Sequence, residues 1–221
     1  MANIKAAIFD MDGTLVDSLS FWPTIWKKIG KKYLGIDGYD PDPELAKRVQ
    51  TMLLCDAAVY LNEACSIGAD NDEFKEYICN QLNDFYKTVA TVKEGAFELL
   101  EHLRAKRVKL CLATATQSEY ARTAYTTLGL DKYLPVFISC TDIGKGKDQP
   151  DIYLRAIELL GGTPEETYVF EDSYVALKTA ITVGIHPVGI YDKYNFHKDL
   201  ESISEIYLAP DMTMRDLIKF F

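Results

Sequence analysis

The sequence predicts an α/β fold with an inserted all-α segment, and three observations lead to this prediction. A short apolar run, Ala6–Phe9, is followed at once by acidic residues and Gly13, as a buried strand followed by a turn would be. Residues 20–90 carry helical patterns without a clear strand. From Lys93 onward, helical and strand-like segments alternate.

The first strand places two carboxylates at its carboxyl end. Ala6–Phe9 has the length and the β-branched or aromatic character of a buried strand, and Asp10 and Asp12 follow it directly. In an open α/β sheet, ligands bind beyond the carboxyl ends of the strands. In an extended chain these two side chains would point the same way and repel each other unless a cation joined them. The pair therefore predicts a ligand site that includes a cation.

Residues 20–90 are predicted to form consecutive helices. Pro23 fits the first turn of a helix that begins after Ser20, and Asp70 or Asn71 would cap the last helix. Further helical patterns cover residues 44–49, 56–64 and 72–86. An all-α insertion between two α/β pieces indicates a second, mobile module.

The second half of the chain alternates between helix and strand. Predicted helices cover residues 96–105, 119–128, 150–160 and 174–183, and predicted strands cover residues 108–113, 136–139, 167–170 and 188–191. Such alternation predicts parallel strands joined by crossover helices. The predicted fold class is therefore α/β, a Rossmann-like parallel sheet core with an inserted all-α cap domain.

Composition excludes several classes of protein. The 221 residues suffice for a core domain with a small second domain, and the net charge of −9 argues against nucleic acid or an anionic membrane as the main partner. The chain reaches Asp10 before an apolar signal region can form, and no run approaches membrane-spanning length. We expect a cytoplasmic protein with a small-molecule partner. The oligomeric state stays open, and a monomer is compatible with the sequence.

The five cysteines are widely spaced and form no CxxC pair. This spacing indicates neither a zinc site nor a disulfide framework. We therefore expect free thiols in a reducing compartment, most of them buried.

Four polar features are predicted to lie at strand ends. They are Asp10 with Asp12, Thr114, Lys147, and the pair Glu171-Asp172. If the strands are parallel, all four lie along one edge of the sheet. A nucleophilic carboxylate, a hydroxyl, an ammonium and a second acidic pair are the groups that phosphoryl transfer through an aspartyl phosphate requires.

These residues resemble the motifs of the haloacid dehalogenase superfamily, in the branch with a helical (C1-type) cap. Asp10-Met11-Asp12-Gly13-Thr14-Leu15-Val16-Asp17-Ser18 matches the first motif of that family throughout. The other three motifs are matched, in the same order along the chain, by Thr114, Lys147 and the pair Glu171-Asp172. The resemblance spans almost the whole chain. Within the superfamily, the chain is similar to the β-phosphoglucomutase-like and phosphoglycolate phosphatase-like members. The resemblance implies a catalytic core of residues 1–18 and 91–221 and a cap of residues 19–90.

The same resemblance implies roles for the site residues. Asp10 would be the nucleophile, and Asp12 would be the general acid and then the base, since a carboxylic acid can give and recover a proton. Mg²⁺ would be held by Asp10, the backbone carbonyl of Asp12 and Asp172, with Glu171 nearby. Thr114 and Lys147 would hold phosphoryl oxygens. Backbone N–H groups of Met11 and Ala115 would complete the phosphate cradle.

Several alternatives compete with these assignments. The Asp-x-Asp-Gly run could be a calcium loop, but an EF-hand would need Gly in place of Leu15 and Glu in place of Phe21. Phe21 and Trp22 could form a wall that contacts the substrate beside the hinge, or they could belong to the core of the cap. A phosphometabolite-binding module without activity is a third alternative.

The choice of activity within the family depends on two stretches of sequence. Dehalogenase-like and phosphonate-cleaving members resemble this chain without the second acid, so Asp12 points to phosphate chemistry. A mutase such as β-phosphoglucomutase would need basic residues to hold a second phosphate. The corresponding stretch Gln50–Cys55 has none after Arg48. We therefore predict a Mg²⁺-dependent phosphomonoesterase acting on a small phosphorylated metabolite.

Overall fold

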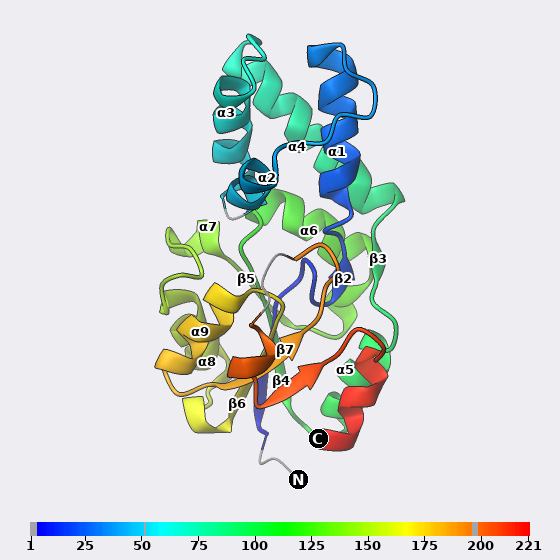
Figure 1. Ribbon diagram of the computed structural model, residues 1–221. Coiled ribbons are helices and arrows are strands. Elements are labelled where there is room, and N and C mark those ends of the chain that lie inside the picture. The colour runs from blue at the N-terminus through cyan, green and yellow to red at the C-terminus, as the bar shows by residue number, and fades with distance from the viewer. Residues whose placement is uncertain (1–3, 51, 196–198) are drawn as a thin grey trace. The chain divides into compact units, whose positions relative to one another are not determined.

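The structure is a computed structural model that describes residues 4–50, 52–195 and 199–221 (Figure 1). The chain forms two compact units. The first, called here the α/β unit, comprises Met1–Leu19 and Thr91–Phe221. The second, called the helical unit, is Ser20–Ala90.

A parallel sheet forms the centre of the α/β unit. Its strand order is β5-β4-β1-β6-β7-β8. The strands are β1 (Ala6–Phe9), β4 (Lys109–Thr114), β5 (Val136–Ser139), β6 (Thr167–Glu171), β7 (His186–Ile190) and β8 (Ile206–Leu208). The predicted parallel α/β fold is thus confirmed.

The central position of β1 follows from its sequence. All four residues of this strand are buried, as expected for a strand covered on both faces. The Phe9 ring stacks on the Phe170 ring of the neighbouring strand at 4.2 Å between centroids. After β1 the chain forms β4 and β5 on one side and then β6, β7 and β8 on the other. The strand order therefore switches direction beside β1, where open α/β sheets bind ligands.

Helices cover both faces of this sheet. They are α5 (Ala96–Ala105), α6 (Ser118–Thr127), α7 (Cys140–Ile143), α8 (Asp151–Leu160) and α9 (Tyr174–Thr182). Helix α8 packs on β1, β4 and β5, and α9 packs on β6 and β7. Figure 1 shows α8 and α9 on one side of the sheet and α5 on the other, where a terminal 3₁₀ helix, Met214–Phe220, packs against α5. Shorter 3₁₀ turns are Leu130–Lys132, Pro164–Glu166 and Glu201–Ile203.

Some elements were not predicted. The two-residue strands β2 (Val16–Asp17) and β3 (Thr91–Val92) form a small antiparallel pair. Strand β8, the terminal 3₁₀ helix and the four-residue α7 were also missing from the prediction. These segments are too short to carry a hydrophobic period.

The helical unit contains the helices expected for its sequence. They are α1 (Phe21–Ile29), followed by a π-helical turn (Gly30–Leu34), α2 (Pro43–Gln50), α3 (Leu54–Ala64) and α4 (Asn71–Thr88). Asp70 caps α4, because its carboxylate accepts hydrogen bonds from the backbone N–H groups of Asp72 and Glu73. The core of the helical unit includes Ile25, Ile29, Leu61, Phe74, Ile78 and Tyr86. Among the described residues, no helix is long and apolar enough to cross a membrane.

Candidate active site

Asp10 stands at the carboxyl end of β1, at the switch in strand order. Its backbone N–H donates to the carbonyl of Phe170 on β6 at 3.0 Å, which ties it to the neighbouring strand. The residue is buried, with 5% of its surface exposed. This position is the one that the sequence predicts.

The turn after Asp10 is tightly closed by backbone hydrogen bonds. The N–H groups of Leu15 and Val16 donate to the carbonyl of Met11 at 3.0 and 2.8 Å. Gly13 has φ = +83°, and a Cβ atom there would lie 2.4 Å from Oδ2 of Asp172. Any larger residue would strain the turn and displace that carboxylate, so glycine is required at position 13.

Three carboxylates from two adjacent strands meet at this edge of the sheet. Glu171 is the last residue of β6, and Asp172 follows it. One oxygen from each of Asp10, Glu171 and Asp172 lies within 4.8 Å of the others, and all three residues are buried. The sheet therefore brings together the acids that the sequence predicted at its strand ends.

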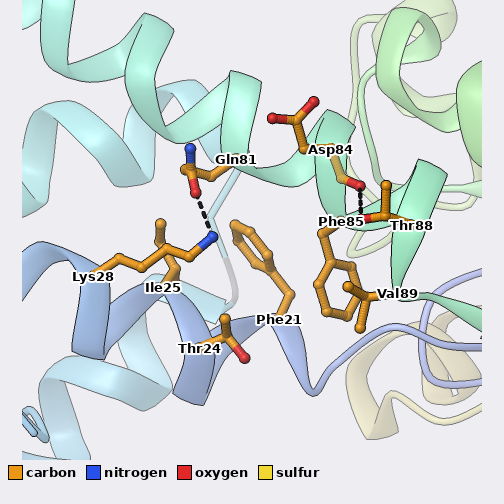
Figure 2. A pocket seen from close by; sticks show the side chains of 9 residues that line it. All are labelled: Phe21, Thr24, Ile25, Lys28, Gln81, Asp84, Phe85, Thr88 and Val89. Atoms are coloured by element: carbon orange, nitrogen blue, oxygen red, sulfur yellow. Dashed lines mark hydrogen bonds between the residues drawn. The ribbon is translucent and has the colours of Figure 1, made fainter.

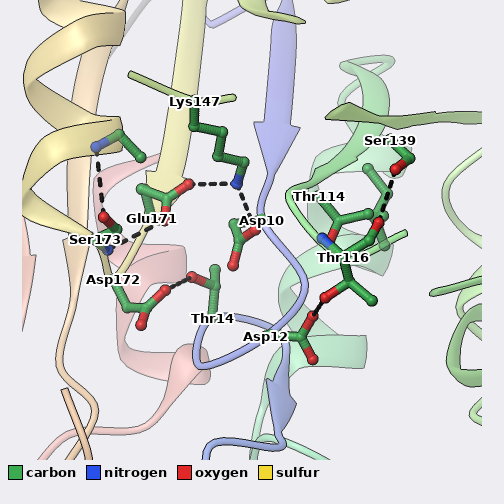
Figure 3. Close-up of polar contacts among 12 residues, drawn as sticks. Asp10, Asp12, Thr14, Thr114, Thr116, Ser139, Lys147, Glu171, Asp172 and Ser173 are labelled. Atoms are coloured by element: carbon green, nitrogen blue, oxygen red, sulfur yellow. Dashed lines mark hydrogen bonds and ion pairs between the residues drawn. The ribbon is translucent and has the colours of Figure 1, made fainter. Parts of the chain in front are cut away.

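The Lys147 ammonium donates to two of these acids, Asp10 and Glu171, the latter at 2.7 Å (Figure 3). Lys147 does not lie at a strand end, where the sequence predicts it. It lies in the loop between α7 and α8, because α7 begins where β5 ends. Its side chain is buried and reaches the cluster from that loop. Lys147 thus contacts the acids expected for it, but from a loop and not from a strand end.

Burial and mutual repulsion set the protonation of this cluster. Burial, together with the Asp10 carboxylate, raises the pKa of Glu171 well above its usual value. The same two causes raise the pKa of Asp172 to about 7. Burial alone would lower the pKa of Lys147, but the Asp10 and Glu171 carboxylates outweigh it and hold that pKa well above its usual value. One ammonium cannot compensate three ionised carboxylates, so burial and repulsion favour the neutral forms of Glu171 and Asp172.

The donor set fits a divalent cation. Oxygen atoms of carboxylates are the ligands that Mg²⁺ prefers, and the cluster supplies three buried carboxyl groups within 4.8 Å of one another. A cation there would remove the repulsion that raises the pKa values of Glu171 and Asp172.

Two further side chains hold Asp172, and neither was predicted to have a role. The Thr14 hydroxyl donates to Oδ1 of Asp172 at 3.1 Å. The Asn195 amide donates to Oδ2 at 2.7 Å and to the backbone carbonyl of Asp172 at 2.8 Å. Thr14 belongs to the first motif, so its position could have suggested a role. Asn195 lies far along the chain in a loop without a motif.

The Asp12 carboxylate has different partners from Asp10. The Ser18 hydroxyl donates to Oδ1 of Asp12 at 2.6 Å, and the Thr116 hydroxyl donates to Oδ2 at 2.8 Å. Figure 3 shows Asp12 beside Thr116 and apart from the group formed by Asp10, Lys147 and Glu171. The turn has therefore rotated the second acid away from the first, contrary to the parallel orientation that an extended chain would give.

Thr114 ends β4, next to β1, and is fully buried. Its hydroxyl accepts a hydrogen bond from the backbone N–H of Thr116 at 3.0 Å and keeps its own proton to donate. The Ser139 hydroxyl donates to the carbonyl of Thr116 at 2.7 Å and fixes the same loop. Ala115 is exposed in this loop.

Three further residues, Met11, Phe21 and Trp22, were predicted to contact the substrate. The Met11 side chain is fully buried, so only its backbone could contact a substrate. Phe21 and Trp22 belong to α1 of the helical unit, and the Phe21 ring packs edge-on against Phe85 at 5.6 Å between centroids. This packing is that of a core residue. A contact of Phe21 or Trp22 with substrate stays a prediction.

Phe21 also lines a pocket between α1 and α4, with a volume of about 90 Å³ (Figure 2). The other lining residues are Thr24, Ile25, Lys28, Gln81, Asp84, Phe85, Thr88 and Val89. Across it, the Lys28 ammonium donates to the Gln81 side-chain carbonyl at 2.5 Å. The pocket is small and its polar side chains are partly engaged with each other.

The α/β fold brings three buried acids together at the carboxyl ends of neighbouring parallel strands, and comparisons with known proteins show the family. Residues 4–184 match the model of the haloacid dehalogenase-like hydrolases. The chain belongs to this family. The predicted membership is thereby confirmed.

Relatives resemble the chain along its whole length. It is 28% identical over 217 residues to a phosphorylated carbohydrates phosphatase of Thermotoga maritima, covering 98% of this chain and 99% of the relative. It is 30% identical to validoxylamine A 7'-phosphate phosphatase of Streptomyces hygroscopicus subsp. limoneus, covering 96% and 94%. The crystal structure of a candidate beta-phosphoglucomutase from Thermotoga maritima superposes with a TM-score of 0.80 at 28% identity, covering 98% and 99%.

Proposed function

We propose that this protein is a Mg²⁺-dependent phosphomonoesterase that acts through a phosphorylated Asp10. One observation carries the proposal: a buried carboxylate at the end of β1 contacts an ammonium and lies beside two further acids, while a second acid is held apart by two hydroxyls. Attack, charge compensation and proton transfer are thus assigned to different side chains. Such a division suits a two-step displacement at phosphorus.

In the first step, a carboxylate oxygen of Asp10 attacks phosphorus and Asp12 protonates the leaving oxygen. In the second step, Asp12 takes a proton from water, which attacks the phosphorus of phosphorylated Asp10 and releases phosphate. Lys147 offsets the repulsion between Asp10 and the substrate. The Thr114 hydroxyl donates a hydrogen bond to one phosphoryl oxygen, and the backbone N–H groups of Met11 and Ala115 donate to the other phosphoryl oxygens.

Asp10, Asp172 and the backbone carbonyl of Asp12 would hold Mg²⁺, with Glu171 nearby. When bound, the ion supplies positive charge against the phosphoryl oxygens. Thr14 and Asn195 orient Asp172 for this purpose.

The substrate we propose is a small phosphorylated carbohydrate or polyol. Support comes from the two whole-length relatives named as phosphatases of a phosphorylated carbohydrate and of validoxylamine A 7'-phosphate. The proposed leaving group carries no second phosphate.

A phosphosugar mutase is the second candidate, because a similar structure is that of a candidate beta-phosphoglucomutase. A mutase needs a basic side chain for the second phosphate. The described residues of the Gln50–Cys55 stretch are uncharged, and Thr51 lies outside the described residues. The guanidinium of Arg48 lies 4.4 Å from the centre of the Tyr60 ring. These observations favour the phosphatase.

We also propose that the helical unit acts as a cap that admits substrate and then excludes water. The hinges would lie near Asp17–Leu19 and Thr88–Lys93. Strands β2 and β3, which pair with each other, hold the two ends of the connection together on the α/β unit.

The test is phosphate release from p-nitrophenyl phosphate and from a panel of phosphorylated sugars and polyols. We expect release with Mg²⁺, no release with excess EDTA, and a loss on the order of 10⁴-fold or more in Asp10→Asn. Undiminished hydrolysis by Asp10→Asn would refute the mechanism. Interconversion of glucose 1-phosphate and glucose 6-phosphate with a bisphosphate primer would favour the mutase, and binding without turnover would favour the binding module.

A further inference from the structure

Two cysteines of the helical unit lie with their sulfur atoms close together. Cys55 is the second residue of α3 and Cys79 lies in the middle of α4, and their Sγ atoms are 4.0 Å apart. The two helices pack against each other, so the pair belongs to a packed interface. None of the five cysteines, all of them within the described residues, is in a disulfide.

Formation of a disulfide requires the two sulfur atoms to approach to about 2.0 Å. Side-chain rotation and a small shift of the first turn of α3 can supply this movement. The first turn follows Leu53, an exposed residue in extended conformation. The sequence separation of 24 residues is long enough for a closed loop without local strain.

The two thiols differ in their access to solvent. Cys55 is half-buried, whereas only 3% of Cys79 is exposed. A small oxidant would therefore meet Cys55 first, and Cys79 is placed to react with the product. This is the arrangement of a reactive cysteine beside a resolving cysteine.

The other three cysteines have different surroundings. Burial raises the pKa of Cys111 to about 12 and that of Cys140 to about 11, and the thiolate is the reactive form. Cys65, at the end of α3, is half-buried like Cys55, and its sulfur lies 3.7 Å from the Tyr39 hydroxyl. Cys65 thus provides a matched control on the same helix.

We propose that Cys55 and Cys79 form a reversible redox site, in which a peroxide converts the two thiols into a disulfide that joins α3 to α4. The Cys55 sulfur attacks one oxygen of hydrogen peroxide, the O–O bond breaks, and Cys55 sulfenic acid and water result. The Cys79 sulfur then attacks the Cys55 sulfur. The S–O bond breaks, and the departing oxygen leaves with the thiol proton as a second water.

The bond would anchor the start of α3, and with it Met52 and Leu53, which lead into this helix, to α4. In a reducing compartment such a disulfide is transient, which suits a sensor of oxidants. The site does not depend on the proposed phosphatase activity.

The experiment counts thiols in the intact protein before and after hydrogen peroxide, by alkylation under denaturing conditions and intact mass. We expect the count to fall from five to three, with a loss of two hydrogens, and to return to five after dithiothreitol. Peptide mapping without reduction should recover the Cys55–Cys79 cross-link.

Variants separate this site from general thiol oxidation. Cys65→Ser should still form the cross-link, whereas Cys55→Ser should lose no thiols. Cys79→Ser should accumulate a sulfenic acid on Cys55, detectable by dimedone labelling. The proposal is overturned if the wild type keeps all five thiols, if the cross-link involves Cys65, or if it joins two molecules.

Discussion

Asp10 and Asp12 are separated by a single residue, Met11, yet their carboxylates have different neighbours. Asp10 contacts the Lys147 ammonium, whereas Asp12 accepts hydrogen bonds from Ser18 and Thr116. The first arrangement places a positive charge beside the proposed nucleophile, where it offsets repulsion between Asp10 and a phosphoryl group. The second places two hydroxyl donors on Asp12, which orient the group proposed to transfer the proton.

The contact between Thr116 and Asp12 leads to a prediction about proton transfer. Thr116→Val removes the hydroxyl that orients Asp12 while it keeps the volume of the side chain. We expect kcat for an alkyl phosphate to fall about 10-fold, a part of the roughly 10²- to 10⁴-fold that general acid–base catalysis contributes. The fall should be smaller for an aryl phosphate, whose leaving group needs less protonation.

Thr126→Val is the control for this variant, because Thr126 is exposed on α6 and its hydroxyl donates to the backbone carbonyls of Arg122 and Thr123 in the same helix. It should leave kcat unchanged. Equal rates for Thr116→Val and wild type on the alkyl phosphate would contradict the proposed orientation of Asp12.

Asn195 gives a second prediction at this scale, because its amide donates twice to Asp172. Asn195→Ala should raise the Mg²⁺ concentration for half-maximal activity by about 10- to 100-fold, as loss of a partner of a metal ligand does. Activity at saturating Mg²⁺ should largely recover. The exposed neighbour variant Lys193→Ala should behave like wild type in the same Mg²⁺ titration, and an unchanged titration in Asn195→Ala would count against the role of Asp172.

At the scale of elements, regular segments could be predicted and short ones could not. Ala6–Phe9 and Ala96–Ala105 have the predicted bounds, because continuous apolar runs and helical periods extend over their whole length. Helix α7 has four residues and starts directly after β5, so its sequence has no period to detect. That missed helix is the reason why Lys147 was expected at a strand end.

The same limit applies to the site. Acidic residues that follow apolar strands could be located from the sequence, since parallel strands bring their carboxyl ends to one edge. Thr116 and Asn195 could not, because their roles depend on loops whose paths are set by contacts such as that between Ser139 and the carbonyl of Thr116. The orientation of Asp12 likewise depends on the turn at Gly13 and not on strand geometry.

A prediction about helix α4 tests the helical unit. Asp70→Ala removes the cap from two backbone N–H groups and should lower the free energy of unfolding of this unit by about 1 kcal/mol. Asp70→Ser should retain most of the stability, because serine also caps helices. Tryptophan fluorescence during urea denaturation is a suitable measurement, since the chain has two tryptophans, Trp22 and Trp26, both in α1. Equal midpoints for all three proteins would contradict the capping role.

At the scale of the whole molecule, the parallel sheet carries the proposed chemistry and the helical unit is proposed to select the substrate. The acids, Lys147 and Thr114 all belong to the α/β unit, whereas Phe21 and Trp22 belong to the helical unit. Changes in the helical unit should therefore alter the choice of leaving group more than the phosphoryl step. The residues of the α/β unit carry the motifs of the family. The identity of the substrate is proposed to depend on residues of the helical unit.

The central claim is that Asp10 becomes phosphorylated, and a trapping experiment tests it most directly. Asp12→Ala should still accept a phosphoryl group from an aryl phosphate with Mg²⁺ and then hydrolyse it slowly, because the second step lacks its base. Mass spectrometry of the quenched protein should find one phosphoryl group on the peptide that contains Asp10, and none in the variant Asp10→Asn. A phosphoryl group on another residue, or none in Asp12→Ala during turnover of the aryl phosphate, would contradict the mechanism.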